Sequence, residues 1–409
     1  MTMNKVAIIG VGHTNFGRLE DNGLMDLLCE ASLEAIEDAN SSNRDFDSVY
    51  VGVMSPEILN HISGVASALV DRISLIPAAA DDIKNGPASG GSAIKAGFQA
   101  IASGLSEIVL VVGGEKMTHI TTPGYITSNI ATLTHPEAER PHGVSLPSFA
   151  GLLTRSYLEK YNAKIDWISD IAIKNHKNGA LNPNAHFQRT IEEIMKSAIQ
   201  KGRGNWDSVY DFLKDDKTNP IIADPLRLFH ICPISDGAAA LVLCNAEKAR
   251  EFCDSPILIS GIGQATDTHI VFEREDLTTL KALRICSDQA YKMAKKTPDN
   301  IDVAELHDAF EILEAVQSED IGFFKKGEGA KAAHEGQTEI GGKIPINPSG
   351  GLKARGHPLG ATGVAQVVEL VWQLRGEAGK RQVNGANTGI TCNFGGFGNN
   401  IISILVEKM

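Results

Sequence analysis

The sequence lacks an excess of positive charge, paired cysteines and long apolar runs. Its 38 lysine and arginine residues are outnumbered by 50 aspartate and glutamate residues, which gives a formal net charge of −12. This balance argues against nucleic-acid partners and against binding to an anionic membrane surface. The six cysteines form no CxxC pair, so we expect no disulfide framework, no metal site and a reduced, cytoplasmic setting. No stretch approaches the about 20 consecutive apolar residues of a membrane helix, so we expect a soluble protein.

Glycine is abundant, with 40 residues in a chain of 409. This length favours two domains or more. Apolar, strand-like runs at residues 6–12, 46–53 and 107–114 alternate with helical patterns at residues 24–39 and 89–103. Such alternation predicts an α/β fold with parallel strand pairing and right-handed crossovers.

Residues from about 118 to 220 differ in character from the rest. They are richer in histidine, proline and polar residues, and their helical patterns at 148–161 and 189–201 are amphipathic. We interpret them as an excursion from the sheet. Long insertions of this kind often carry substrate contacts.

The chain then repeats itself. The run at residues 257–263 resembles the run at residues 6–12, because Gly261 and Gly263 stand 251 positions after Gly10 and Gly12. The following helix and strand patterns also recur. We therefore predict two copies of one βαβαβ unit, at residues 1–250 with the insertion and at residues 251–409, with a site between them.

Four glycine-rich or polar turns are expected to meet at that site. They are KNGPASGG at residues 84–91, HDAF at 307–310, NPSGGLKARGHPLGATGVAQ at 347–366 and TCNFGGFG at 391–398. Glycine-dense loops allow the backbone to approach a ligand closely, and loops that lead into a helix point free N–H groups at negative charge.

His357 is the most prominent polar residue of these turns. It stands between Gly356 and Pro358, immediately before a helical pattern. There it could donate a hydrogen bond to a carbonyl oxygen. The alternative is that these three residues form only a tight turn.

These motifs resemble the thiolase superfamily over essentially the whole chain, in its archaeal and sterol-carrier-protein-type branch. AELHDAFEILEA resembles that branch's His-Asp-x-Phe motif, and NPSGGLKARGHPLGATG resembles its most recognisable signature. CNFGGFG is similar to its C-terminal Cys-x-x-Gly-Gly or His-Asn-x-Gly-Gly loop. The resemblance implies a thiolase fold, in which duplicated βαβαβ half-domains form a five-layered α/β/α/β/α body with a loop-domain insertion.

The resemblance also implies a function and partners. It implies C–C bond chemistry next to a coenzyme A thioester, with coenzyme A as substrate or product and no permanently bound cofactor. The substrate would be an acyl-CoA. A homodimer is implied, and a small zinc-ribbon and OB-fold partner protein is a further expectation.

Roles for individual residues follow from the same resemblance. His357 would activate the nucleophile and help to hold the thioester oxygen, His307 would donate to an enolate oxygen, and Cys392 would move the proton at the α-carbon. The substrate and oxyanion loops would contain Pro87, Gly356, Gly395 and Gly396.

Pro87 is the main departure from the family pattern. It stands where thiolases carry the acyl-accepting cysteine, and proline has no nucleophilic atom. Three explanations stay open. The protein could be a retro-aldol lyase acting on a β-hydroxyacyl-CoA, it could use Cys392 or Ser89 as another nucleophile, or it could be a non-acylating, coenzyme A-binding subunit. For Ser89 we favour a turn or helix-cap role.

Other polar residues receive structural interpretations. Cys232 reads as a core thiol, and Asp308 reads as a helix cap. Lys84, Lys353 and Arg355 could meet coenzyme A phosphates, although exposed, solvated side chains are the commoner case.

Overall fold

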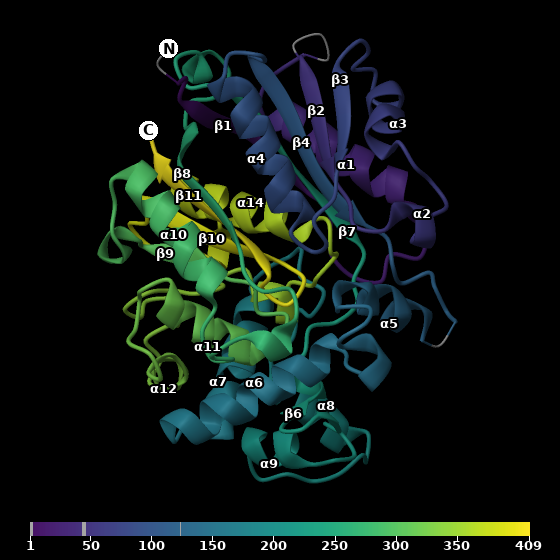
Figure 1. Cartoon of the computed structure of the whole chain (residues 1–409), viewed down its shortest axis with the longest axis vertical. Helices are drawn as coiled ribbons and strands as arrows, with labels where there is room; N and C mark the ends of the chain where they lie inside the picture. The colour runs from purple at the N-terminus through teal and green to yellow at the C-terminus, as the bar shows by residue number, and fades with distance from the viewer. Residues whose placement is uncertain (1–2, 43–45, 123) are drawn as a thin grey trace.

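The computed structural model describes residues 3–42, 46–122 and 124–409, which form a mixed α/β structure around one large sheet (Figure 1). Its nine strands lie in the order β3-β2-β4-β7-β1-β8-β11-β10-β9. They are β1 Val6–His13, β2 Ser48–Gly52, β3 Ala79–Ile83, β4 Ile108–Glu115, β7 Gly237–Asn245, β8 Ile257–Thr266, β9 Val303–Glu305, β10 Thr388–Gly395 and β11 Asn400–Lys408.

The sheet contains the predicted duplication. From edge to centre, β2-β4-β7-β1 in the first half corresponds to β9-β10-β11-β8 in the second, and β3 is an additional edge strand of the first half. In both halves the first strand of this series pairs parallel with the second, and the remaining neighbours in the series pair antiparallel. The two halves join where residues 6–8 of β1 pair with residues 257–259 of β8.

The prediction of parallel pairing holds for β2 with β3 and β4 and for β9 with β10, but not for the rest of the sheet. Strands β1, β7, β8 and β11 pair only antiparallel with their neighbours. The reason is clearest for β10 and β11, because residues 396–399 connect them directly and so short a connection cannot return a strand in the parallel direction.

Helices divide the body into five layers. The helices that cover the sheet are α1 Leu24–Asp38, α3 Val65–Arg72, α4 Ser89–Ala102, α10 Lys281–Ala294, α11 Glu311–Asp320 and α14 Thr362–Arg375. Helices α4 and α14 contact each other between the two half-sheets and share one apolar core with both. Helices α1 and α3 cover the outer face of the first half, and α10 and α11 cover that of the second. This arrangement confirms the predicted α/β/α/β/α order.

The repeated glycines explain how α1 and α10 lie so close to the sheet. A Cβ at Gly12 would stand 2.1 Å from the carbonyl oxygen of Ala31, and one at Gly263 would stand 1.8 Å from that of Cys286. No side chain fits there. The repeated glycines of the sequence thus mark a helix-on-strand contact that occurs once in each half.

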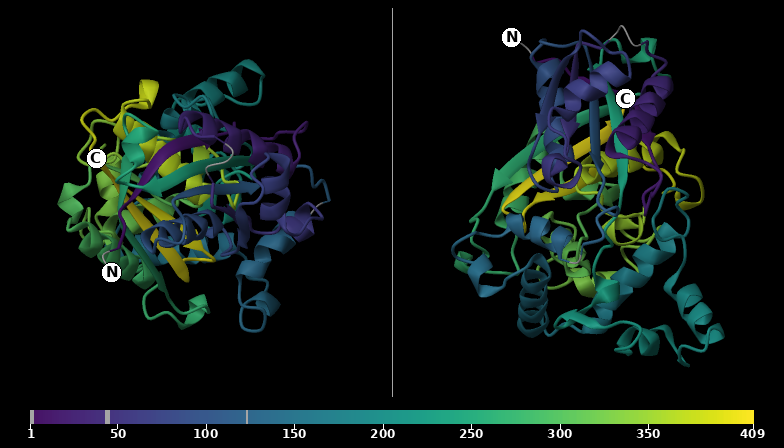
Figure 2. Two further views of the ribbon diagram at one scale, coloured as in Figure 1. Left: turned by 90° about the horizontal axis from the view of Figure 1, so that it is seen from above. Right: turned by 90° about the vertical axis from the view of Figure 1, so that its right-hand side faces the viewer.

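The insertion between β4 and β7 lies below the sheet, at the end of the molecule opposite the chain termini (Figures 1 and 2). It contains α5 Tyr125–Ile130, α6 Leu146–Tyr161, α7 Ile165–Gly179, α8 Ile191–Gln200, α9 Val209–Lys214 and the small sheet β5 Ile221–Ala223 and β6 Leu226–Arg227. Helix α7 was not predicted, because the second half of its buried face carries Lys174, Asn175, His176 and Asn178, which interrupt the apolar pattern begun by Ile168, Ile171 and Ala172.

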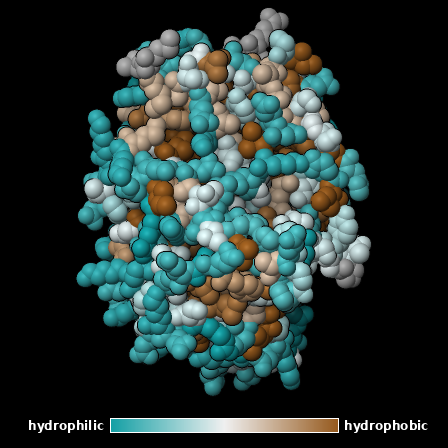
Figure 3. Space-filling view, in the orientation of Figure 1, coloured by the Kyte–Doolittle hydropathy of each residue, from teal (hydrophilic) through white to brown (hydrophobic). Residues whose placement is uncertain are grey.

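Shorter helices complete the fold. They are α2 Pro56–Leu59, α12 Gly329–His334 and α13 Gly351–Ala354. The face in Figure 3 is largely polar, with scattered apolar residues. Within the described ranges, we find no helix whose length and hydropathy would allow it to cross a bilayer.

We predict that Gly263→Ala destabilises the protein. The new methyl group must displace the backbone of α10, so the free energy of unfolding should fall by about 2–3 kcal/mol, as measured by urea denaturation. Gly17→Ala is the control, because a Cβ there meets no atom within 4 Å. Equal stability of the two variants would contradict the close contact.

Candidate active site

A cavity of about 250 Å³ lies where the two halves and the insertion meet. Four predicted site residues line it, namely Pro87, His307, His357 and Gly396. The other lining residues are Met117, Ile130, Leu133, Leu146, Pro147, Ile231, Cys232, Pro233, Ile234, Ala309, Phe310, Leu313, Leu359, Phe394 and Phe397. Two imidazoles thus stand in an almost wholly apolar wall.

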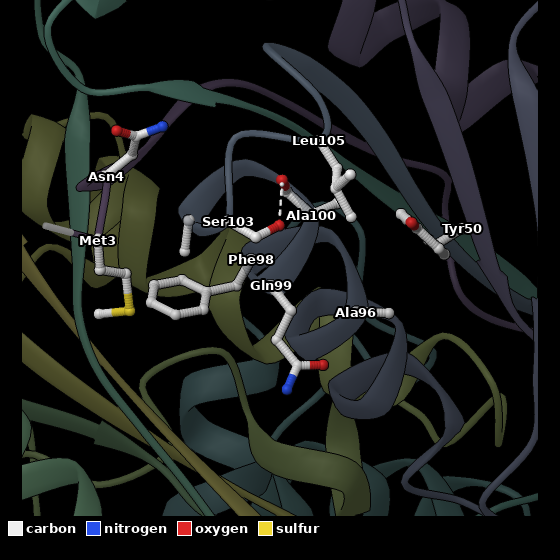
Figure 4. A pocket seen from close by; sticks show the side chains of 10 residues that line it. Met3, Asn4, Tyr50, Ala96, Phe98, Gln99, Ala100, Ser103 and Leu105 are labelled. Carbon is white, nitrogen blue, oxygen red and sulfur yellow. Dashed lines mark hydrogen bonds between the residues drawn. The ribbon is translucent and has the colours of Figure 1, made fainter. Parts of the chain in front are cut away.

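A larger hollow of about 970 Å³ lies elsewhere, and Figure 4 shows its side chains. It is lined by the C-terminal half of α4 together with Met3, Tyr50 and Leu105. Because Pro87 precedes the opposite end of this 14-residue helix, the hollow is about 20 Å from the imidazoles. It contains no histidine, cysteine or carboxylate, so we do not regard it as a catalytic site.

His307 and His357 lie edge to face, with ring centroids 5.0 Å apart and ring planes at 87°. His357 Nδ1 lies 2.7 Å from the Thr362 hydroxyl, which donates its own proton to the carbonyl oxygen of Pro358 at 3.0 Å. With this direction for the hydroxyl proton, we assign the hydroxyl oxygen as the acceptor from His357, which places the imidazole proton on Nδ1. Nε2 of His357 is then free to accept a proton.

His307 has the opposite tautomer. Its Nδ1 lies 3.5 Å from the main-chain N–H of Phe394 and 3.4 Å from Nδ2 of Asn393. Both of these groups can only donate, so Nδ1 accepts and the proton of a neutral ring resides on Nε2. The ring is also stacked on Phe394 at a centroid distance of 5.1 Å. One imidazole can thus donate from Nε2 and the other can accept at Nε2.

Both rings are held neutral. Burial lowers the pKa of His357 to about 3, assisted by the positive charge of Arg355. Burial also lowers the pKa of His307 well below its usual value, with contributions from His357 and Arg355. A buried imidazole that loses hydration strongly disfavours the charged form.

Asn393 occupies a position that the sequence analysis missed. Its Oδ1 accepts from the N–H of Gly91 at 3.2 Å, which fixes the amide so that Nδ2 donates to the carbonyl oxygen of Pro87 at 3.3 Å and to His307. Asn393 therefore connects the turn before α4 with the first imidazole. Strand alternation could have revealed it, because adjacent residues of a strand point to opposite faces.

Cys392, which was predicted to move the proton at the α-carbon, lies away from the cavity. It belongs to the apolar core on the other face of β10, beside Cys286 of α10, and it does not line the cavity. Burial raises the pKa of its thiol well above the usual value. The structure therefore places Cys392 in the core and not in the cavity wall, and its role at the α-carbon stays a prediction.

The structure agrees with the role predicted for Ser89 but not with that predicted for Cys232. Cys232, interpreted as a core thiol, in fact lines the cavity, although burial raises its pKa to about 12. Ser89 is fully buried, accepts from the N–H of Asn85 at 2.9 Å and donates to the carbonyl oxygen of Gly86 at 2.7 Å. This confirms the turn role of Ser89.

The remaining loop glycines lie behind the cavity wall. A Cβ at Gly395 would stand 2.7 Å from the side chain of Asn85, and one at Gly356 would stand 2.9 Å from that of Ser235. Neither glycine lines the cavity, whereas Gly396 does. Their role here is to let loops pack closely.

A segment of the insertion, residues 174–187, holds the loop at residues 346–357. Side chains of Lys174, Asn178 and Asn182 donate to the carbonyl oxygens of residues 346, 347 and 349 at 2.8, 3.0 and 2.9 Å. Main-chain N–H groups of residues 186 and 187 donate to the carbonyl oxygens of residues 355 and 354, each at 2.9 Å. The polar motif NHKNGALNPNAHFQ thus fixes the loop that carries His357.

The same segment contacts a buried acidic group. Nδ2 of Asn175 lies 2.9, 3.1 and 3.2 Å from oxygens of Asp308, Glu311 and Glu314. These three carboxylates could in principle hold a metal ion, but the Asn175 amide already stands among them. Burial raises the pKa of Asp308 to about 7 and that of Glu311 well above its usual value. Asp308 also accepts from the N–H groups of residues 352 and 353, which agrees with a capping role.

Two basic residues were predicted to be more often exposed, and both are buried. Lys353 donates to the carbonyl oxygen of Ile231 at 2.7 Å, and Arg355 pairs with Glu305 at 3.2 Å. Neither offers its charge to a phosphate at the surface. Their sequence position in a glycine-rich loop gave no sign that the loop is enclosed by the insertion.

We predict that His357→Gln makes stability less dependent on pH. The folded-state pKa of about 3 lies below the unfolded value of about 6.5, so the unfolded chain binds the proton first and stability is lost as pH falls through this window. Without the imidazole, the slope of unfolding free energy between about pH 6 and pH 4 should decrease by about 1.4 kcal/mol per pH unit. Urea denaturation at several pH values measures this slope. The control is His142→Gln at an exposed site, and equal slopes for both variants would contradict a buried neutral ring.

Comparison with known proteins is consistent with this architecture. Residues 6–247 match the family "Thiolase, N-terminal domain", and residues 263–408 match "Thiolase C-terminal domain-like". The chain is 43% identical over 398 residues to an acetyl-CoA acetyltransferase of Methanothermobacter thermautotrophicus, covering 97% of both proteins. It is 32% identical over 414 residues to sterol carrier protein 2 of Homo sapiens, covering 96% of this chain and 70% of that protein.

A solved structure shows the same fold. The structure titled "Ltp2-ChsH2(DUF35) aldolase" aligns with a TM-score of 0.80 at 23% identity, covering 100% of this chain and 98% of that one. The two domain matches together span most of the described residues. The chain therefore belongs to the thiolase family, in the branch of the archaeal and sterol carrier protein 2-type relatives, and is a thiolase-like acyltransferase by family.

Proposed function

We propose that the protein makes or breaks a C–C bond next to the thioester of an acyl-CoA, through an enolate and without a cysteine acyl-enzyme. The observation that carries this proposal is the pair of neutral imidazoles with opposite tautomers in an apolar cavity, beside Pro87. Such a pair supplies a donor and a base, but no nucleophile. Enolate chemistry requires the first two.

The two imidazoles have separate roles in this proposal. The Nε2–H of His307 donates to the thioester oxygen, on which negative charge develops. Nε2 of His357 accepts a proton from the substrate. The protonated His357 then stands beside the enolate, and their attraction in a dry site offsets the burial that otherwise disfavours an imidazolium.

Retro-aldol cleavage fits these groups with no further component. His357 removes the proton of a β-hydroxyl group, the β-carbon becomes a carbonyl, and the Cα–Cβ bond breaks. Its electron pair forms the enolate, whose oxygen is held by His307. The proton on His357 then passes to Cα, which leaves an acyl-CoA and a free aldehyde or ketone.

Acyl transfer to coenzyme A is the second candidate, favoured by the relative at 43% identity that is named an acetyl-CoA acetyltransferase. Here His357 would take the proton of the coenzyme A thiol, and the thiolate would attack the β-carbonyl of a 3-ketoacyl-CoA directly. The Cα–Cβ bond would break to the same enolate. This route requires two coenzyme A groups at the cavity at one time, which an acyl-enzyme would otherwise avoid.

We predict that the substrate and product distinguish these reactions. The protein is incubated with a branched β-hydroxyacyl-CoA, and separately with acetoacetyl-CoA plus coenzyme A, and products are identified by mass spectrometry. In the reaction that proceeds, His307→Asn and His357→Gln should each lower kcat/KM by about 100-fold or more. Coenzyme A binding without turnover of either substrate would instead support a non-acylating subunit.

Intact-mass measurement on the same samples tests whether the protein forms a covalent acyl-enzyme. The unsubstituted protein should carry no acyl group, whereas Pro87→Cys should acquire one when given an acyl-CoA and Pro87→Ala should not. An acyl adduct on the unsubstituted protein would contradict the proposal.

We further propose that the chain works in the cytoplasm as a homodimer of two-domain subunits, with boundaries at residues 1–250 and 251–409. The matched ranges, residues 6–247 and 263–408, are consistent with this division. Strand β3 pairs only with β2 at the edge of the sheet, and an open edge can accept another strand. A small zinc-ribbon and OB-fold protein remains a candidate partner.

A further inference from the structure

The wall of the cavity limits what the acyl group can be. Apart from the two imidazoles and the thiol of Cys232, every side chain that lines it is apolar. The imidazoles have their Nδ1 atoms engaged by Thr362, Asn393 and Phe394, so each offers one nitrogen to a ligand. The imidazoles therefore offer two polar contacts, one donor and one acceptor, beside the weakly polar thiol of Cys232.

Those two contacts are fully used by the reacting atoms. In the proposed reaction the thioester oxygen takes the Nε2–H of His307, and the oxygen at the β-carbon takes Nε2 of His357. A further amide, hydroxyl or charged group in this cavity would be desolvated without a partner, which is unfavourable. The part of the acyl group beyond the β-carbon must therefore be hydrocarbon, and the amides of the pantetheine arm must lie outside.

The volume gives the size of that hydrocarbon. An apolar cavity of about 150 Å³ holds one benzene molecule, with six heavy atoms. By the same ratio the cavity of about 250 Å³ holds about ten. The thioester sulfur, carbonyl and α-carbon account for about four of these, which leaves room for about six carbons. An acetyl group would leave most of the cavity unfilled.

The insertion forms the side of the cavity whose side chains can be substituted without opening the core. Leu313 is 2% exposed, Phe397 is 5% exposed and Phe310 is 6% exposed, so the wall from the second half is closed. Leu133 and Leu146 from the insertion are half-buried and form the outer side. Leu146 is the first residue of α6, so its side chain can be changed without opening the central core.

We infer that this site takes an acyl-CoA whose acyl group is an apolar chain or branched skeleton of about six carbons counted from the β-carbon, with its length limited by Leu146. The inference depends on the proposed function only for the location of the thioester at the imidazoles. It departs from acetyl-CoA, the substrate in the name of the relative at 43% identity.

The test is a series of dissociation constants for acetyl-, butyryl-, hexanoyl-, octanoyl- and decanoyl-CoA, measured by calorimetry with the full chain. Each added methylene that enters the cavity should tighten binding by about fourfold. We expect this gain up to about octanoyl-CoA, followed by no further gain. Equal affinity for acetyl- and octanoyl-CoA would overturn the inference.

Substitutions of Leu146 test whether this residue limits the length of the acyl group. Leu146→Trp should move the tightest binding to a chain shorter by about two carbons, and Leu146→Ala should move it to a longer chain. Leu152→Trp is the matched control, because Leu152 lies on the same helix, is 44% exposed and does not line the cavity. Thermal denaturation of each variant establishes that it is folded. An unchanged chain-length profile in both Leu146 variants would contradict the assigned wall.

These measurements separate the two proposals. Binding is measured without turnover, so the expected chain-length profile together with no C–C bond reaction would contradict the proposed function alone. Turnover of short substrates together with a flat binding profile would contradict the acyl-group inference alone.

Discussion

The site depends on two hydrogen bonds that set the tautomers of His307 and His357 in opposite senses. The Thr362 hydroxyl is assigned as the acceptor from His357, with its own proton donated to the carbonyl oxygen of Pro358. The N–H of Phe394 can only donate to His307. Neither the Thr362 hydroxyl nor the N–H of Phe394 is titratable. The donor and acceptor roles therefore stay the same when other groups gain or lose a proton. Two imidazoles 5.0 Å apart in an apolar wall would otherwise be equivalent.

Both of these partners belong to the second copy of the structural unit, and the first copy contributes the turn with Pro87. Phe394 belongs to β10, Thr362 begins α14, and the turn with Pro87 leads into α4, the counterpart of α14 in the first half. Contact between α4 and α14 brings the two turns together, and residues 174–187 of the insertion hold the second loop in place. The cavity therefore lies where the two copies of the unit meet, and the polar insertion fixes the position of the loop that carries His357.

Much of this could be predicted from the sequence. The repeated glycines at 10, 12, 261 and 263 gave the duplication, because only glycine allows helices to contact the strands so closely. The motifs gave Pro87, His307 and His357 at one site. The choice between Cys392 and Asn393 required the register of β10, because adjacent residues of a strand face opposite sides and only one of them faces α4 and α14. Helix α7 escaped prediction because it buries amides and a lysine in its second half, after the apolar residues Ile168, Ile171 and Ala172.

Pro87 and Asn393 are joined by a hydrogen bond beside the first imidazole. Asn393 Nδ2 donates both to the carbonyl oxygen of Pro87 and to Nδ1 of His307, while its Oδ1 is held by the N–H of Gly91. A thiol at that position has one weak proton and could not satisfy both acceptors. The amide of Asn393 therefore links the turn at Pro87 to the first imidazole and holds the two in one arrangement. The polar groups nearest to Pro87 and His307 are paired with each other, as is usual for buried polar groups.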